Sequence, residues 1–180
     1  MSPKPNNKNM NTTMFKLAAC ALLILACGTK VSAQASASAT STATIITPIT
    51  ITKTSDMNFG NVAVSATTNG TVVMTPAGVR SATAGVTLPG TSGTVSAAAF
   101  TVNGQSGYTY AITLPASLTI SDGGSNSMVV DNFTSTPTAT GTLTGGTETL
   151  EVGATLNVNL SQAPGVYTSA TPFTVTVNYN

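Results

Sequence analysis

A period-two alternation of apolar and polar side chains, repeated in short runs, most constrains the fold. In YTYAITLP (residues 108–115) the aromatic and aliphatic side chains take every second position, and in TPFTVTVNYN (residues 171–180) they do so again. Successive side chains of a strand point to opposite faces of a sheet, so each run has one apolar face and one polar face. The runs lack the 3.6-residue period of an amphipathic helix. The alternation therefore predicts an all-β fold.

Turn residues separate these runs at short intervals. Asn69-Gly70, Gly145-Gly146 and the loop DGGSNS (residues 122–127) are examples. Short strands with one solvent-exposed face, joined by such turns, are typical of an antiparallel sandwich of two sheets. The alanines of TSGTVSAAAFTV (residues 91–102) would suit a helix, but Gly93 and the flanking threonines favour a strand. The sequence predicts about nine or ten short strands.

The first 33 residues have the pattern of a signal peptide. Lysines at positions 4, 8 and 16 precede the apolar run LAACALLILACG, which spans residues 17–28. A run of roughly a dozen apolar residues is too short to cross a bilayer, which needs about 20. Val31 and Ala33 are the small residues that signal peptidase requires, so cleavage is expected between Ala33 and Gln34. The exported chain is then expected to have no transmembrane segment and to be secreted or held at the bacterial cell surface.

Cys27 offers a second way of processing the same segment. It follows Ile24-Leu25-Ala26, which loosely resembles a lipoprotein box with an acylated cysteine. Cys20 has a better local match, but too little apolar sequence precedes it. Lipid anchoring at Cys27 is therefore the alternative to a free exported protein. Cleavage after Ala33 removes both cysteines and excludes disulfides from the exported chain.

The exported chain divides into a short leader and one domain. Residues 34–43, QASASATSTA, are low-complexity Ala/Ser/Thr sequence and are expected to be a flexible leader. Residues 44–180 are expected to form a single β-sandwich domain that is long enough to bury a core. The run at 44–53 alternates but contains Pro48, which cannot donate a ladder hydrogen bond. An edge strand or a bend is expected there.

Charge and composition exclude several functions. The exported chain has the five acidic residues but only Lys53 and Arg80 as bases, so nucleic acid is a poor partner. It has no histidine and no cysteine, which removes the common hydrolytic triads and zinc sites. Glu148 and Glu151 are three apart on an expected strand and point to opposite faces. The sequence therefore predicts no catalytic residue, no cofactor and no enzyme activity.

Two weak ligand sites remain as alternatives. Asp122, Asn126, Asp131 and the adjacent Asn132 supply oxygens near a Gly-rich loop that could hold Ca²⁺, although an Asp-Gly turn capping its own backbone explains the pattern better. Tyr108 and Tyr110 would stack on a glycan if they faced solvent, but they share a face with aliphatic residues and are expected in the core. A monomeric sandwich that binds glycan or calcium is the alternative function.

Three stretches resemble one bacterial family. MNFGNVAV (residues 57–64), FTVNGQSGYTYAITLP (residues 100–115) and the tail from residue 152 to residue 180 look like the secreted domain of unknown function 4402. The resemblance covers residues 44–180. That family is similar to spore-coat-U-like and chaperone–usher fimbrial subunit domains, which implies an immunoglobulin-like antiparallel β-sandwich. The matching motifs are spacings of turns and strands, so they identify a fold better than an activity.

The tail implies how such a protein would act. Gly165, Tyr167 and the penultimate Tyr179 resemble the end of fimbrial subunits, in which a neighbour's N-terminal strand completes the sandwich. Under this resemblance Ile45, Ile49 and Ile51 are the partner-strand residues. The side chains at the edge and core of the last strand are Phe173, Val175, Val177 and Tyr179. The partners would be identical or related subunits, with a periplasmic chaperone.

The same residues allow a closed monomer. Residues 44–53 would then be the first strand of the chain's own sandwich, and the sequence leaves pairing within the chain and pairing between chains both open. In either form we expect an exported, non-enzymatic structural or adhesive surface protein. Pairing between chains would make it a fimbrial-type subunit that assembles through its strand edges.

Overall fold

The computed structural model describes residues 33–180. This part of the chain contains twelve β-strands, one 3₁₀ turn and no α-helix. Every strand pairing in it is antiparallel. The prediction of an all-β antiparallel sandwich is confirmed.

The strands are short except for two. Their bounds are β1 Thr50–Ser55, β2 Ala63–Val64, β3 Gly70–Met74, β4 Arg80–Ala84, β5 Val86–Thr87, β6 Ala98–Asn103, β7 Thr109–Thr113, β8 Ser117–Ser121, β9 Ser127–Thr136, β10 Thr140–Thr142, β11 Thr147–Val158 and β12 Thr176–Tyr179. The 3₁₀ turn Thr144–Gly146 joins β10 to β11 and has Gly145 at a φ of 68°. This is the Gly-Gly turn that the sequence predicts.

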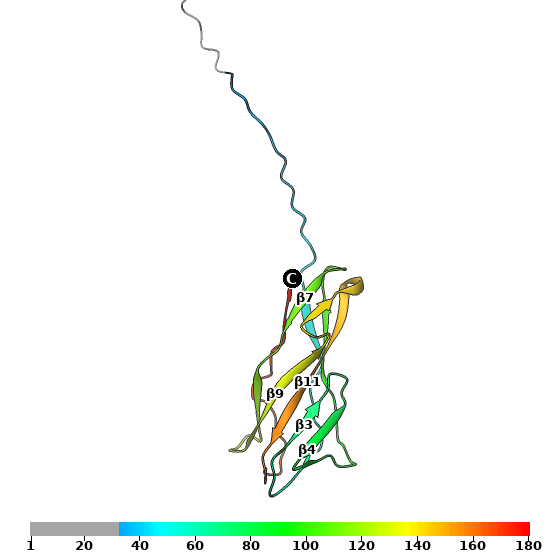
Figure 1. Cartoon of the computed structure of the whole chain (residues 1–180), viewed down its shortest axis with the longest axis vertical. Coiled ribbons are helices and arrows are strands. Elements are labelled where there is room, and N and C mark those ends of the chain that lie inside the picture. The colour runs from blue at the N-terminus through cyan, green and yellow to red at the C-terminus, as the bar shows by residue number, and fades with distance from the viewer. Residues whose placement is uncertain (1–32) are drawn as a thin grey trace, which may run out of the picture. The chain divides into compact units, whose positions relative to one another are not determined.

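Strand β11 is the spine of the larger, seven-stranded sheet. One side of β11 pairs with β6 along its first half and with β3 along its second half, while its other side pairs with β9. Strand β1 extends the sheet beyond β6, β4 extends it beyond β3, and β8 extends it beyond β9. Figure 1 shows β11 running between β9 and β3 along the length of the sandwich.

A smaller sheet of three strands, ordered β10-β7-β12, covers one end of the spine. Its register pairs Tyr110 with both Gly141 and Tyr179. The C-terminus and β7 lie at one end of the sandwich, and β3 and β4 lie toward the other (Figure 1). Strands β7 and β8 follow one another in the chain but lie in different sheets, so the chain passes from the small sheet to the large one between them.

The core consists of two adjoining clusters of buried side chains. One surrounds Tyr110, Leu143 and Leu150 beneath the small sheet, and the other surrounds Val72, Met74 and Leu156 between β3, β9 and β11. Met57 and Phe133 pack against both clusters. The apolar residues at alternate positions of β11 supply both cores, which explains why this strand is the longest.

The structure corrects the predicted strand boundaries in three places. TETLEV (residues 147–152) and ATLNVNLS (residues 154–161) have the alternation of two separate strands, but residues 147–158 form the single strand β11, because Gly153 continues the ladder through an irregularity opposite β9. Strands β4 and β5 were not expected, so there are twelve strands instead of nine or ten. The first strand begins at Thr50, and residues 33–49 form no strand.

Residues 44–180 form one compact unit. Residues 33–43 are exposed and have no secondary structure. The expected signal peptide, with Cys20 and Cys27, falls on residues 1–32 and lies outside the described part of the chain. Within the described part, no helix has the length and apolar character needed to cross a membrane.

Gly153 gives a test of the spine. A Cβ at this position would overlap the backbone of Met74, Thr75 and Pro76, where β11 approaches the end of β3. We expect Gly153→Ala to lower the free energy of unfolding by about 1–3 kcal/mol, the usual cost of overpacking. Urea unfolding followed by circular dichroism measures this loss. The matched control is Gly90→Ala, since a Cβ there meets open space; equal effects of both substitutions would contradict the assignment.

Candidate functional site

An apolar cleft opens along one side of the sandwich. Its volume is about 930 Å³, within the range of protein binding sites. Its floor consists of core side chains: Phe100, Leu118 and Ile120 are half buried, and Met128 and Leu156 are buried. These residues come from β6, β8, β9 and β11, so the cleft reaches the core of the sandwich.

Two continuous stretches of chain form the lips of the cleft. The first lip is residues 53–62, the end of β1 and the segment after it, and the second lip is residues 162–173, the segment that leads toward β12. Strand β1 is the terminal strand of the large sheet, and β12 is the terminal strand of the small sheet. The cleft therefore lies at the seam where the two sheets would join if another strand were present.

Tyr179 closes the seam at one end. Its hydroxyl donates a hydrogen bond to the carbonyl oxygen of Thr47 (2.8 Å) and accepts one from the backbone N–H of Gln105 (2.6 Å). The ring also packs edge-on against Tyr108, with the ring centroids 5.8 Å apart. The chain just before β1 is thus tied to β12 at this end, and the seam opens beyond it.

The second lip has backbone groups free for pairing. Thr168 forms two backbone hydrogen bonds with Ser121 of β8. From Ser169 to Val175 the backbone makes no hydrogen bond with any other described residue, and regular pairing resumes at Thr176. Free N–H and C=O groups beside an apolar floor are the features that an added strand uses.

Arg80 holds the first lip in place. Its guanidinium donates hydrogen bonds to the carbonyl oxygens of Phe59, of Asn61 (2.9 Å) and of Ser92 (3.4 Å). The planar fork of an arginine suits several acceptors at once. The segment is fixed further by paired backbone hydrogen bonds between Asn58 and Ser96. The first lip is therefore anchored on the side away from the cleft.

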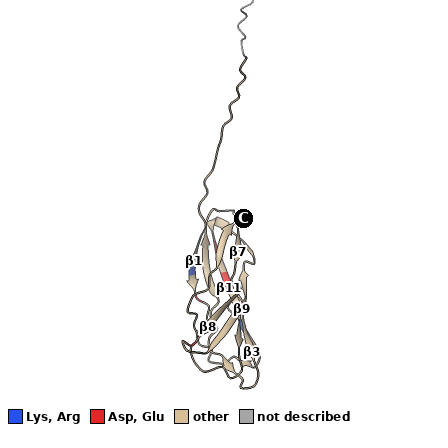
Figure 2. Cartoon of the chain, turned by 90° about the vertical axis from the view of Figure 1, so that its left-hand side faces the viewer, with Lys and Arg blue, Asp and Glu red and all other residues tan. Residues whose placement is uncertain are grey.

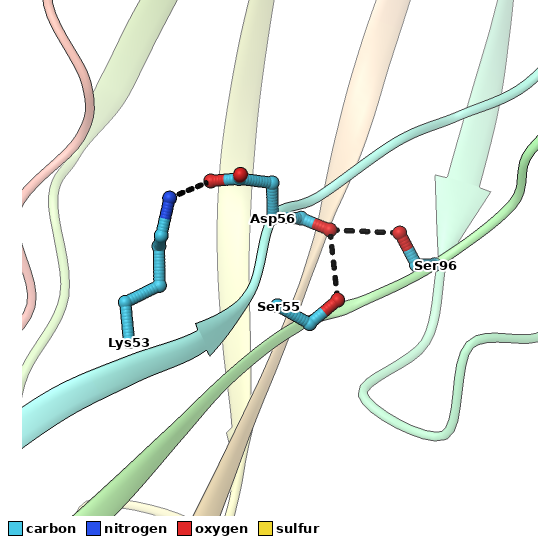
Figure 3. A network of polar contacts seen from close by, with 4 residues as sticks. All are labelled: Lys53, Ser55, Asp56 and Ser96. Carbon is cyan, nitrogen blue, oxygen red and sulfur yellow. Dashed lines mark hydrogen bonds and ion pairs between the residues drawn. The ribbon is translucent and has the colours of Figure 1, made fainter.

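Lys53 lies on the first lip of the cleft. Its ammonium forms a 2.6 Å ion pair with Asp56, whose own carbonyl oxygen accepts hydrogen bonds from the hydroxyls of Ser96 and Ser55 (Figure 3). Both charged side chains are largely exposed, so the pair adds little to stability. It neutralises the two charged residues that line the cleft.

The tail residues named from the sequence lie beside the cleft. Val175 and Val177 are buried in the core cluster beneath the small sheet, and Phe173 and Tyr179 pack against the same cluster. Phe173 also lines the cleft and contacts Phe133 with the ring centroids 5.1 Å apart. Of these four residues, only Val177 and Tyr179 belong to a paired strand, β12, which spans residues 176–179.

Tyr167 shapes the second lip. Its hydroxyl donates to the carbonyl oxygen of Ala163 (2.8 Å) and accepts from the side-chain amide of Gln162 (2.9 Å), while its ring packs against the core. Gly165 lies between these contacts and lines the cleft. The Gly-Tyr pattern in the tail thus builds a compact loop at one border of the cleft.

The three isoleucines expected on the partner strand lie in different surroundings. Ile49 and Ile51 pack against the chain's own core, and β1 pairs with β6 of the same chain. Ile45 is 92% exposed. Of the three, only Ile45 is free to contact another molecule in this arrangement.

The calcium candidates form two separate pairs, Asp122 with Asn126 and Asp131 with Asn132. Asp122 accepts hydrogen bonds from the side-chain amide of Asn126 (2.6 Å) and the backbone N–H of Gly124 (2.8 Å), and these bonds lower the pKa of the Asp122 carboxyl below its usual value. Asp131 pairs with Ser117 at the opposite end of β8, next to Asn132. The described residues contain no group of three His, Cys, Asp or Glu side chains placed to hold a metal.

A buried polar pair was missed by the sequence analysis. The hydroxyl of Tyr110, which is fully buried, donates to Glu148 (2.8 Å), and the same carboxylate accepts from the N–H of Thr142 (2.8 Å). Burial, with the hydrogen bond to Glu148, raises the pKa of Tyr110 well above its usual value. Tyr108 is 44% exposed despite sharing the alternation, because it lies just before β7. This pair joins the two sheets and stabilises the fold.

The fold and cleft define a class of protein: an antiparallel β-sandwich with one open seam. The chain matches the family described as Domain of unknown function (DUF4402) over residues 49–179. Because the match covers most of the chain, the protein belongs to this family. No curated protein and no solved structure matches the chain significantly.

Arg80 gives a test of the first lip. Arg80→Met leaves the carbonyl of Phe59 without its donor in a partly buried site, and a lost bond of this kind costs about 1–3 kcal/mol. We expect that loss in the free energy of unfolding, together with faster hydrogen exchange at residues 57–62. The control is Lys53→Met, which removes an exposed charge and should change stability by about 1 kcal/mol or less. Unchanged exchange at the lip in Arg80→Met would refute its anchoring role.

Asp122 gives a pH-dependent test of the loop between β8 and β9. Its folded pKa is lowered, so its ionised form stabilises the fold above the unfolded value of about 3.9. That contribution is lost as the pH falls through the folded pKa. We therefore expect Asp122→Asn to be less stable than the parent at neutral pH, with the difference shrinking below about pH 4.

Urea unfolding of both proteins over a pH series measures this difference, with Asp131→Asn as the control. A difference that stays constant from neutral to acid pH would show that the carboxylate is not the cause. A calcium-dependent rise in Tm that Asp122→Ala abolishes would instead support a calcium site.

Proposed function

We propose that this protein is an exported, non-enzymatic structural or adhesive component of the bacterial surface that assembles by strand-edge pairing. The observation that carries the proposal is the open seam: an apolar cleft of about 930 Å³ between the terminal strands of two sheets. Its floor consists of buried and half-buried core side chains, and its second lip has a stretch of unpaired backbone. An added strand would cover the first and pair with the second.

The seam supports a macromolecular partner. An exposed strand edge is a template for association, and proteins usually block it with charges, prolines or a covering segment. In residues 34–180 the bases are Lys53 and Arg80, and both are already engaged with Asp56 or with carbonyl oxygens. Figure 2 shows how few charged positions the strands carry. Little electrostatic repulsion would oppose close contact between copies.

Assembly through this seam predicts polymers. A contact in which one region of a copy fits a different region of the next is heterologous, and it produces open chains unless the rotation closes a ring. Fimbrial-type subunits, identical or related, with help from a periplasmic chaperone, would be the partners. Export with cleavage after Ala33, or lipid anchoring at Cys27, would place the protein at the cell surface or outside it.

Electrophoresis of the exported protein tests this function. The full chain is expressed with its own leader in a bacterium, and the protein recovered from outside the cytoplasm is run in detergent without heating. We expect a ladder of multiples that collapses to one band on boiling, because strand-paired assemblies resist detergent until they unfold. The parent analysed by light scattering over a concentration series is the second readout. A monomer at every concentration, with unfolding independent of concentration, would reject assembly.

A further inference from the structure

We propose that the strand that fills the cleft is residues 35–45 of a second copy of the chain. This inference rests on the proposed function and names the partner of the same site. Sequence composition alone suggests that most of this segment is a flexible leader, whereas we infer that it is a donated strand.

Residues 35–45 have the alternating pattern of a β-strand but form no strand in the single chain. From 35 to 45 the odd positions carry Ala35, Ala37, Ala39, Ser41, Ala43 and Ile45, while every even position carries Ser or Thr. A period of two produces one methyl-bearing face and one hydroxyl-bearing face in an extended chain. Glycine and proline are both absent from these eleven positions. Yet residues 35–45 are exposed and unpaired in the single chain.

The anchored start of β1 limits how much chain can be donated. Thr47 is hydrogen-bonded to Gln105 and Tyr179, and Ile49 and Ile51 cover the chain's own core. Donating these residues would uncover that core. The donated strand must therefore end before Thr47, and residues 35–45 are the segment that remains. Of the three isoleucines expected on the partner strand, only Ile45 belongs to it.

The cleft runs between two stretches of chain. Each lip contributes about ten lining residues, which is close to the eleven residues of the segment. A compact small molecule would cover part of the floor and would leave the free backbone of Ser169–Val175 unpaired. An added strand would cover the floor along the lips and would pair with this backbone.

The chemistry of the two surfaces also agrees. The segment has no charged residue, and the two charged residues that line the cleft, Lys53 and Asp56, pair with each other. Insertion therefore buries no unpaired charge. The floor already consists of large side chains such as Phe100, Leu118 and Met128, so the incoming face needs only small ones. Alanines facing the floor and hydroxyls facing solvent meet this requirement.

Disulfide trapping tests the assignment. Cys20 and Cys27 are replaced by alanine in the full chain before export, so that no native thiol remains whichever way it is processed, and Leu118→Cys places one thiol in the floor of the cleft. A second thiol is then placed at odd positions (Ala37→Cys, Ala39→Cys, Ala43→Cys) or at matched even positions (Ser38→Cys, Thr40→Cys, Thr42→Cys). After mild oxidation, we expect linked multimers on denaturing gels for at least one odd position and for no even position.

The outcomes separate this inference from the proposed function. If unheated multimers form but no position is trapped, or odd and even positions are trapped alike, the donated strand is wrong while assembly stands. If neither multimers nor links form, both fail. A disulfide confined to the monomer would show that the segment fills its own cleft, which overturns the second copy. Val166→Cys on the exposed second lip replaces Leu118→Cys if the latter does not fold.

A peptide gives an independent measurement. We expect a synthetic peptide of residues 34–46 to shift the NMR signals of residues 169–175 in a variant that lacks residues 34–43, whose compact unit begins at Thr44. The control peptide carries aspartate at positions 37, 39 and 43, which would bury charge in the cleft. Equal shifts with both peptides, or shifts with neither, would contradict the proposal.

Discussion

The structure depends on one long strand that is paired along its whole length and on both sides from Glu151 to Asn157. Strand β11 pairs with β6 and β3 on one side and with β9 on the other. Most residues from Leu150 to Val158 are buried, where an unpaired backbone group would be costly. Gly153 permits the close approach to β3 that keeps the ladder continuous. All other strands are positioned relative to this spine.

A spine of this kind closes only one side of the sandwich. Strand β9 links the spine to β8, while β1 and β12 end the two sheets on the opposite side without pairing to each other. The Tyr179 hydroxyl ties them at one end, and beyond it the interior is open. Half-buried core side chains beside unpaired backbone invite non-specific pairing. Their occurrence together at the cleft is the main support for the partner that we propose.

The sequence predicts the fold class because its information is local. Alternation in YTYAITLP and in the tail identifies strands, and Gly145-Gly146 identifies a turn, without knowledge of distant contacts. Partner choice is not local: whether TETLEV and ATLNVNLS form one strand depends on what packs beside Gly153, and β4 becomes visible only as the neighbour of β3. The cleft was missed for the same reason. The polar, Pro- and Gly-containing stretch at residues 162–172 resembles any surface loop until its position opposite residues 53–62 is known.

The two ends of the seam differ in how much of their backbone is hydrogen-bonded, which is why we propose a partner at one end and not at the other. At the Tyr179 end, a single hydroxyl satisfies one donor and one acceptor, and Tyr108 shields the ring, so few groups are left unpaired. Along residues 169–175 no side chain or backbone group of the described residues forms such hydrogen bonds to the backbone, and Phe173 lines the cleft. An uncharged strand would supply backbone partners and apolar cover together, which water cannot do. The unpaired backbone of residues 169–175 thus favours an extended peptide strand over other occupants of the cleft.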